Sequence, residues 1–168
     1  IEYMSSILDH AKFNQFLLLI RDSDISNIHA INFLDELYPE QLRNIYNPPA
    51  IMFYRGNKNL LLTTCLAIVG SRNATEYSYR CVQGLVSKIA GKYTIVSGLA
   101  RGVDSWAHQA TLANGGNTIA VIGSSLEVSY PKENIDLQAS IAKSGLLLSE
   151  YPPGSQINRW HFPQRNRI

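Results

Sequence analysis

The sequence lacks the features that mark several large classes of protein. Its two cysteines, Cys65 and Cys81, show no CxxC or cysteine–histidine spacing, which favours reduced packing residues over a disulfide or a zinc site. No run approaches the about 20 apolar residues that cross a bilayer, so we expect no membrane segment. The net charge is only +2. This excludes a surface that is basic all over, and nucleic-acid binding would need a local patch.

The motifs of several enzyme classes are absent as well. No GxGxxG follows any expected strand, and Gly98 stands where a ribose-binding acid would end the second strand, which argues against a nicotinamide dehydrogenase. The absence of GxxxxGK[ST] argues against an NTPase. No GxSxG is present, and the four histidines do not cluster with acids at metal-ligand spacing. We therefore expect no catalytic residue, no metal and no cofactor.

From Cys65 onwards, short apolar runs alternate with amphipathic segments. Each run ends at small residues, and a helical pattern follows the first three. The expected strands are 66–69, 93–97, 118–122 and 146–149; the expected helices are 75–90, 103–113 and a third that follows Tyr130-Pro131 and ends at Gly145. We expect the continuous apolar run 66–69 to be buried on both faces. The pattern predicts an α/β fold, a Rossmann-like three-layer sandwich with a mostly parallel sheet.

The first 60 residues show a different pattern. We expect a helix over 1–23, a short strand over 28–33, a helix over 39–45 and a strand over 51–54. The predicted organisation is an N-terminal extension with helices and strands, 1–60, and a Rossmann-like domain, 61–168.

Small residues and arginines follow the strands of the expected sheet. Ser97-Gly98-Leu99-Ala100-Arg101-Gly102 comes after the second strand and directly before a helix. Glycines let backbone N–H groups approach a ligand, and the helix N-terminus adds about half a positive charge. Gly70-Ser71-Arg72 ends the first strand, and Gly123-Ser124-Ser125 ends the third. Because these ends meet at one edge of a parallel sheet, the sequence predicts an anion site there.

Two further groups of residues allow more than one interpretation. Asp104 and His108 share a helix face, either as a catalytic pair with Glu150 or as structural support of the loop, and we favour support. The segment Arg159–Arg167 interleaves cations with aromatic rings, which suits the phosphates and unpaired bases of a single strand. It would also suit a solvated basic loop with Trp160 and Phe162 packed in the core.

Six motifs resemble, in order and spacing, those of the DNA-processing protein A family (DprA/Smf). They are Ile68–Arg72, Ser97–Asp104 with Ala107-His108, Thr118–Gly123, Tyr130–Asn134, Ser149–Gly154 and Phe162–Arg167. Segments 38–42 and 53–57 resemble the lead-in to the family's core. By this resemblance the DNA site comprises Gly70, Ser71, Arg72, Ser97, Gly98, Leu99, Ala100, Arg101, Gly102, Gly123, Lys132, Phe162, Arg165, Asn166 and Arg167, with Asp104, His108 and Glu150 as support.

The resemblance implies a cytoplasmic, non-enzymatic protein that binds single-stranded DNA and forms homodimers at full length. Such a protein protects incoming strands and helps to load RecA recombinase during natural transformation and recombination. Ser125 and Gln164 stand where the family commonly has glycine and arginine. Because family members continue past Arg-Asn-Arg, we expect further strands after residue 168. The alternatives are a phosphoribohydrolase-like nucleotide enzyme, whose PGGxGTxxE motif this chain lacks, and a small-nucleotide sensor.

Overall fold

The computed structural model describes residues 27–168, which form one six-stranded mixed sheet in the order β1-β2-β6-β5-β4-β3. Four of the strands run parallel to one another: β6 (Leu146–Ser149), β5 (Thr118–Ile122), β4 (Thr94–Ser97) and β3 (Cys65–Ala67). Strand β2 (Ile51–Gly56) pairs antiparallel with β6, and β1 (His29–Asn32) pairs antiparallel with β2. The expected α/β fold with a mostly parallel sheet is confirmed.

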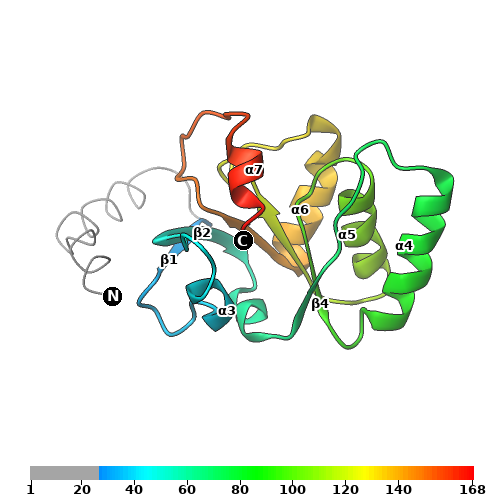
Figure 1. Ribbon diagram of the computed structural model, residues 1–168, viewed down its shortest axis with the longest axis horizontal. Helices are drawn as coiled ribbons and strands as arrows, with labels where there is room; N and C mark the ends of the chain where they lie inside the picture. The colour runs from blue at the N-terminus through cyan, green and yellow to red at the C-terminus, as the bar shows by residue number, and fades with distance from the viewer. Residues whose placement is uncertain (1–26) are drawn as a thin grey trace.

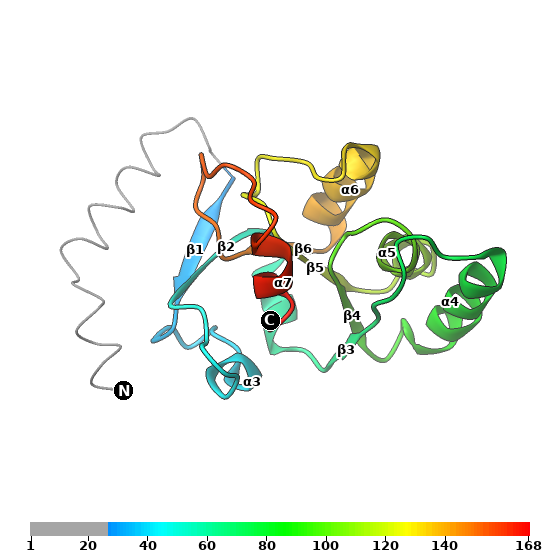
Figure 2. The same ribbon diagram turned by 45° about the horizontal axis from the view of Figure 1, so that its top comes forward.

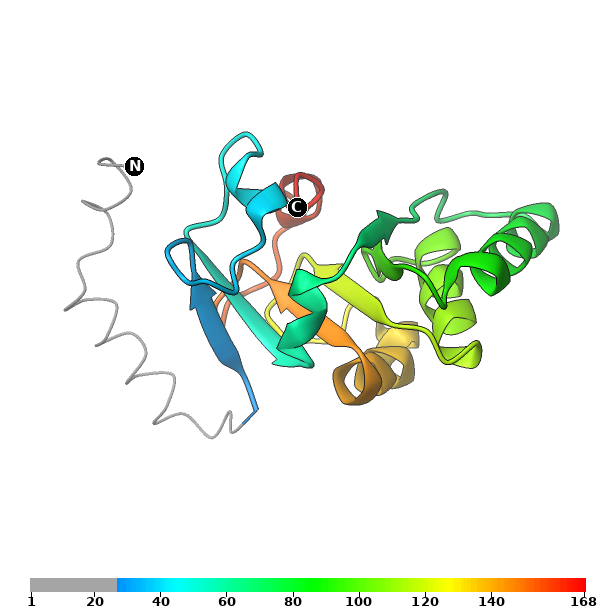
Figure 3. The ribbon, with the colours of Figure 1, turned by 90° about the horizontal axis from the view of Figure 1, so that it is seen from below.

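Alternating residues of the central strands face two different layers. Ala120 and Ile122 pack in a core with Ile141 of α6 (Ile135–Ser144). Ile119 and Val121 pack on the other face, with Leu42 of α3 (Glu40–Arg43) and with η1 (Lys58–Leu62). Helix α3 and helix α6 therefore cover opposite faces of the sheet (Figure 3).

Helices α4 (Glu76–Ile89) and α5 (Val103–Ala113) complete the layer to which α6 belongs (Figure 1). Val82 and Val86 of α4 pack with Ile95 of β4 and with Ala107 and Ala110 of α5. The start of α4 is capped by Thr75, whose Oγ1 accepts a hydrogen bond from the Ser78 amide at 3.3 Å. The bounds of these three helices agree with the sequence pattern, because each carries an apolar stripe long enough to define its period.

Strand β3 contradicts the expectation of a fully buried first strand. It lies at the edge of the sheet, with β4 as its paired neighbour. Leu66 is 39% exposed, and Val69, the second residue after the strand, is 70% exposed. An apolar run does not tell a central strand from an edge strand, since both have high β propensity. The position of β3 depends on the strand order, which the local sequence does not contain.

The segment before residue 60 contributes strands to the same sheet. The expected elements at 28–33, 39–45 and 51–54 are confirmed as β1, α3 and β2, and the 3₁₀ helix η1 was not expected. The expected helix over 1–23 lies outside the described residues. Phe53 of β2 pairs with Ser149 of β6, so one sheet contains strands from both sides of residue 60. The division into an extension, 1–60, and a domain, 61–168, stays a prediction. No helix within residues 27–168 is long and apolar enough to cross a membrane.

Candidate functional site

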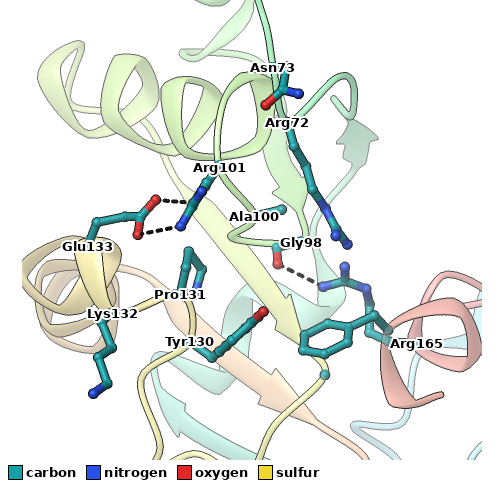
Figure 4. Close-up of a pocket in the computed structure, with 12 residues that line it drawn as sticks. Arg72, Asn73, Gly98, Ala100, Arg101, Tyr130, Pro131, Lys132, Glu133 and Arg165 are labelled. Carbon is teal, nitrogen blue, oxygen red and sulfur yellow. Dashed lines mark hydrogen bonds and ion pairs between the residues drawn. The ribbon is translucent and has the colours of Figure 1, made fainter. Parts of the chain in front are cut away.

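Helix α7 (His161–Arg165) lies beside the carboxyl ends of the parallel strands (Figure 2). An open groove lies next to this helix, lined by residues of the loops that follow these strands. It consists of two adjoining hollows of about 600 and 520 Å³, which share Arg72, Gly98, Ala100 and Arg165 in their walls. The first hollow is also lined by Asn73, Arg101, Gly123, Tyr130, Pro131, Lys132, Glu133 and Phe162 (Figure 4). The sheet therefore brings residues from four separate loops together, at the edge where the sequence predicted an anion site.

The buried carboxylate of Asp104 occupies the N-terminal end of α5. Its Oδ1 accepts a hydrogen bond from the Gly70 amide at 3.3 Å, and its Oδ2 accepts one from the Gly98 amide at 3.2 Å. The helix dipole also favours a negative charge in this first turn. Asp104 thus provides the anion that the sequence led us to expect from a ligand. These two amides already have a partner, so they are not free donors for another anion.

Arg165 fastens α7 to the ends of two strands. Its side chain is 8% exposed, and its Nη1 donates hydrogen bonds to the Gly98 carbonyl at 2.8 Å and to the Val121 carbonyl. Gly98 permits this contact, because an added Cβ would lie 2.5 Å from Nη2 of Arg165. Burial lowers the pKa of the Arg165 guanidinium, and the negative charge of Asp104 opposes that shift. Arg165 is thus committed to backbone carbonyls, although it still lines both hollows.

The side chain of Arg72 extends toward Arg165 at the junction of the two hollows (Figure 4). Arg72 is exposed, and its positive charge contributes to the lowered pKa of Arg165. Two guanidiniums that repel each other both gain when an anion lies between them. The junction therefore brings two positive charges together, with the carboxylate of Asp104 in the wall of the second hollow.

Arg101 lies on the opposite wall and is engaged by an acid. Its Nε contacts Glu133 Oε1, and its Nη2 donates to Glu133 Oε2 at 3.2 Å (Figure 4). Glu133 belongs to η2 (Lys132–Asn134), and the buried Asn134 donates from Nδ2 to the Leu99 carbonyl at 2.9 Å. Lys132 of the same turn is exposed and lines the first hollow. Loop 98–102 and η2 are thus held together as one wall.

Two aromatic rings complete the first hollow. The rings of Tyr130 and Phe162 have centroids 5.1 Å apart and planes tilted by 40°. Phe162 packs directly over Gly123, where an added Cβ would lie 2.9 Å from the ring. Tyr130 is about half exposed. Phe162 is partly buried. Aromatic rings that remain partly accessible beside cations suit flat, unpaired bases that are linked to phosphates.

The C-terminal segment is held by contacts to distant parts of the chain. Arg167 forms an ion pair with Glu150, with Nη2 and Oε1 2.5 Å apart, and its Nε donates to the Asn47 carbonyl at 2.8 Å. Asn166 Oδ1 accepts a hydrogen bond from Arg165 Nε at 3.1 Å. Both Asn166 and Arg167 line the second hollow. Trp160 is exposed, so this ring is not packed in the core as one of the two interpretations held.

Several residues assigned to the site by sequence form its framework. Leu99 is fully buried at a φ of 56°, so only its backbone is near the groove. Ser97 Oγ donates to the Ile68 carbonyl at 2.6 Å. The Ser71 carbonyl accepts a hydrogen bond from the Val103 amide at 3.2 Å, directly after Gly102. This bond joins the loop that follows β3 to the start of α5. These contacts fix the shape of the wall that carries Arg72 and Arg101.

His108 is completely buried beneath the loops. Its Nδ1 lies 2.7 Å from Thr118 Oγ1, and burial lowers its pKa to about 3, so the ring is neutral near pH 7. The three residues considered as a catalytic group have separate partners: Asp104 the loop amides, His108 Thr118, and Glu150 Arg167. No cluster of three or more His, Cys, Asp or Glu within residues 27–168 could hold a metal ion.

Sequence reasoning missed Tyr130, Glu133 and Asn134 as parts of the site. Their signal was the segment Tyr130–Asn134, one of the six motifs, of which only Lys132 entered the predicted site. A wider use of that motif would have included the ring, the acid and the amide. It would not have shown which side chain faces which wall.

Comparisons with known proteins support the resemblance that the motifs indicated. Residues 29–168 match the family described as DNA recombination-mediator protein A. The chain is 47% identical over 139 residues to the DNA processing protein DprA of Streptococcus pneumoniae, which covers 83% of this chain and 49% of that protein. It is 43% identical over 143 residues to the DprA of Bacillus subtilis, with coverage of 84% and 48%. The chain spans about half the length of these curated relatives.

Solved structures agree with this relationship. The X-ray structure of DprA from Streptococcus pneumoniae superposes with a TM-score of 0.81 at 46% identity, over 83% of this chain and 50% of that one. A structure of DNA processing protein A from Helicobacter pylori, concerned with its single-stranded DNA binding mode, superposes with a TM-score of 0.70 at 31% identity, over 83% and 62%. The expected family and the Rossmann-like fold are both confirmed.

Proposed function

The chain belongs to the DNA recombination-mediator protein A family, and from this premise we propose that its groove binds single-stranded DNA. The observation that carries the proposal is the meeting of exposed cations with a half-exposed and a partly buried aromatic ring in one groove. Arg72 and Lys132 are free to contact phosphates, and Tyr130 and Phe162 offer ring faces next to them. Duplex DNA keeps its bases stacked, so only a single strand can use both kinds of contact.

The position of Asp104 favours a strand over a single nucleotide. Proteins that bind nucleotide phosphates commonly use loop amides at a helix N-terminus. Here the amides of Gly70 and Gly98 are bonded to Asp104. The remaining anion contacts come from side chains spread along the groove, which suits a chain of phosphates. This supports strand binding against the alternative of a phosphoribohydrolase-like enzyme or a nucleotide sensor, and we propose a non-enzymatic role.

We further propose that the complete protein protects incoming strands and passes them to RecA recombinase in natural transformation. The family's description as recombination mediators supports this role. Homodimerisation of the complete protein and action in the cytoplasm belong to the same proposal, since RecA acts there. The individual DNA contacts, including those of Arg101 and of Arg165–Arg167, are part of this proposal too.

The test is binding of a fluorescein-labelled oligo-thymidylate, measured by fluorescence anisotropy over a series of salt concentrations. Arg72→Ala should weaken binding with little base preference and reduce the slope of log affinity against log salt by about 0.7, the value for one single-strand phosphate contact. Lys88→Ala is the matched control, because Lys88 lies in the last turn of α4, and so at the end of the parallel strands away from the groove.

Three outcomes would count against strand binding. The first is equal affinity and salt slope for the Arg72→Ala and Lys88→Ala variants. The second is competition by thymidine monophosphate as strong as that by unlabelled oligonucleotide. The third is release of free base when the protein is incubated with mononucleotides, which would support the enzyme alternative.

A further inference from the structure

Glu133 is an acid in the first hollow of the groove, where the other charged side chains among the described lining residues are basic. Among the described residues that line the first hollow, the cations are Arg72, Arg101, Lys132 and Arg165. Both carboxylate oxygens of Glu133 contact the guanidinium of Arg101, and the two side chains are 49% and 61% exposed (Figure 4). An incoming anion at this wall therefore meets an arginine that already has a negative partner.

The surrounding fold holds this pair in place. Glu133 lies in the short turn η2, and the next residue, Asn134, donates its side-chain N–H to the Leu99 carbonyl. Leu99 is fully buried two positions before Arg101. The backbone segments that carry the acid and the arginine are thus tied together, which keeps the two side chains within reach of each other.

We propose that Glu133 determines the specificity of the groove for a strand over isolated phosphate groups. Glu133 occupies Arg101 in the free protein, and a strand that is anchored elsewhere in the groove displaces it. This inference rests on the proposed function, because it needs the groove to bind a strand. Glu133 would then distinguish a single strand from isolated phosphate groups, although both present the same phosphate chemistry to Arg101.

The selection follows from the cost of exchange. A phosphate that binds Arg101 must replace one negative partner by another, and the displaced carboxylate then repels it. A mononucleotide or inorganic phosphate has nothing to offset that cost. A strand that already contacts Arg72, Lys132 and the ring pair brings its next phosphate to Arg101 at high effective concentration. Exposed ion pairs are weak, so the strand can displace Glu133.

The test uses Glu133→Gln, which removes the charge and keeps the size of the side chain. The matched control is Asp136→Asn, because Asp136 is an exposed acid three residues away, in the first turn of α6 and outside the groove lining. Labelled oligo-thymidylate is titrated by anisotropy, and thymidine monophosphate and inorganic phosphate serve as competitors. Circular dichroism confirms that both variants are folded.

Glu133→Gln should bind the oligonucleotide about two- to fivefold more tightly, in line with the strength of an exposed pair. The slope of log affinity against log salt should be steeper for this variant. The substitution should raise the affinity for thymidine monophosphate, measured by competition, by a larger factor than it raises the affinity for the oligonucleotide. Asp136→Asn should change affinity less than twofold. In an Arg101→Ala background, Glu133→Gln should add no more than Asp136→Asn does.

The two proposals fail in different ways. If the wild-type protein binds the oligonucleotide but Glu133→Gln behaves as Asp136→Asn does, the specificity role of Glu133 is wrong and strand binding remains. If the wild-type protein binds no oligonucleotide, the proposed function is wrong, and the role of Glu133 falls with it.

Discussion

Replacement of Arg165 by methionine would separate a structural role from a phosphate contact. Arg165 is 8% exposed and donates to the Gly98 and Val121 carbonyls from a charged group. Methionine has a similar length but no donor, so the Gly98 and Val121 carbonyls would each lose this hydrogen bond. Hydrogen bonds to charged groups contribute about 1.5 to 3 kcal/mol each. We expect the free energy of unfolding to fall by about 3 kcal/mol, the lower end of that sum.

Urea and thermal unfolding measure this loss. For a domain of this size, a loss of about 3 kcal/mol lowers Tm by about 6 to 12 °C. The matched variant is Arg72→Ala, whose side chain is exposed and which should change the unfolding free energy by less than about 0.5 kcal/mol. Arg72→Ala should weaken strand binding in a folded protein, whereas Arg165→Met should lower stability and loosen α7. The reasoning is refuted if Arg165→Met keeps wild-type stability and weakens binding as Arg72→Ala does.

Two further predictions concern the framework beneath the groove. The pKa of His108 is about 3 in the folded state and about 6.5 when unfolded, so the unfolded chain binds more protons between these values. The free energy of unfolding should fall by about 1.4 kcal/mol per pH unit below 6.5 towards 3, and a urea series on His108→Gln should lack this component. Gly98→Ala should lower the free energy of unfolding by about 1 to 3 kcal/mol, because the new Cβ meets Arg165. Gly84 lies inside α4, and a Cβ added there meets nothing within 4 Å, so Gly84→Ala should raise the free energy of unfolding by about 0.5 to 1 kcal/mol. Equal stabilities of the two alanine variants would contradict the packing of Arg165 on Gly98.

The order of strands and helices was readable from the sequence because each element leaves a local pattern. The apolar stripe of residues 76–89 predicts α4, and the run 118–122 predicts β5. The edge of the sheet that carries the site followed from the rule that parallel strands end together. The family followed from six ordered motifs, since residue identity and spacing are themselves sequence information.

The partners of the charged side chains depend on tertiary structure. Arginine stands at positions 72, 101 and 165, but the three side chains differ in their surroundings. Arg72 is exposed, Arg101 is paired with Glu133, and Arg165 is buried against backbone carbonyls. Local sequence does not separate these three states, because each partner comes from a different loop. The sequence predicted that an anion would lie at the glycine loop, but it did not predict that Asp104 would supply it.

The sequence by itself determined the fold class, the elements of the parallel sheet and the edge of the sheet at which the groove lies. Periodicity, glycine and proline positions and motif spacing carry that information along the chain. The tertiary structure alone decided that β3 is an edge strand and which cations face the groove. The physical reason is that burial and ion pairing depend on residues brought together from distant parts of the chain, up to 120 positions apart in the case of Arg167 and Asn47.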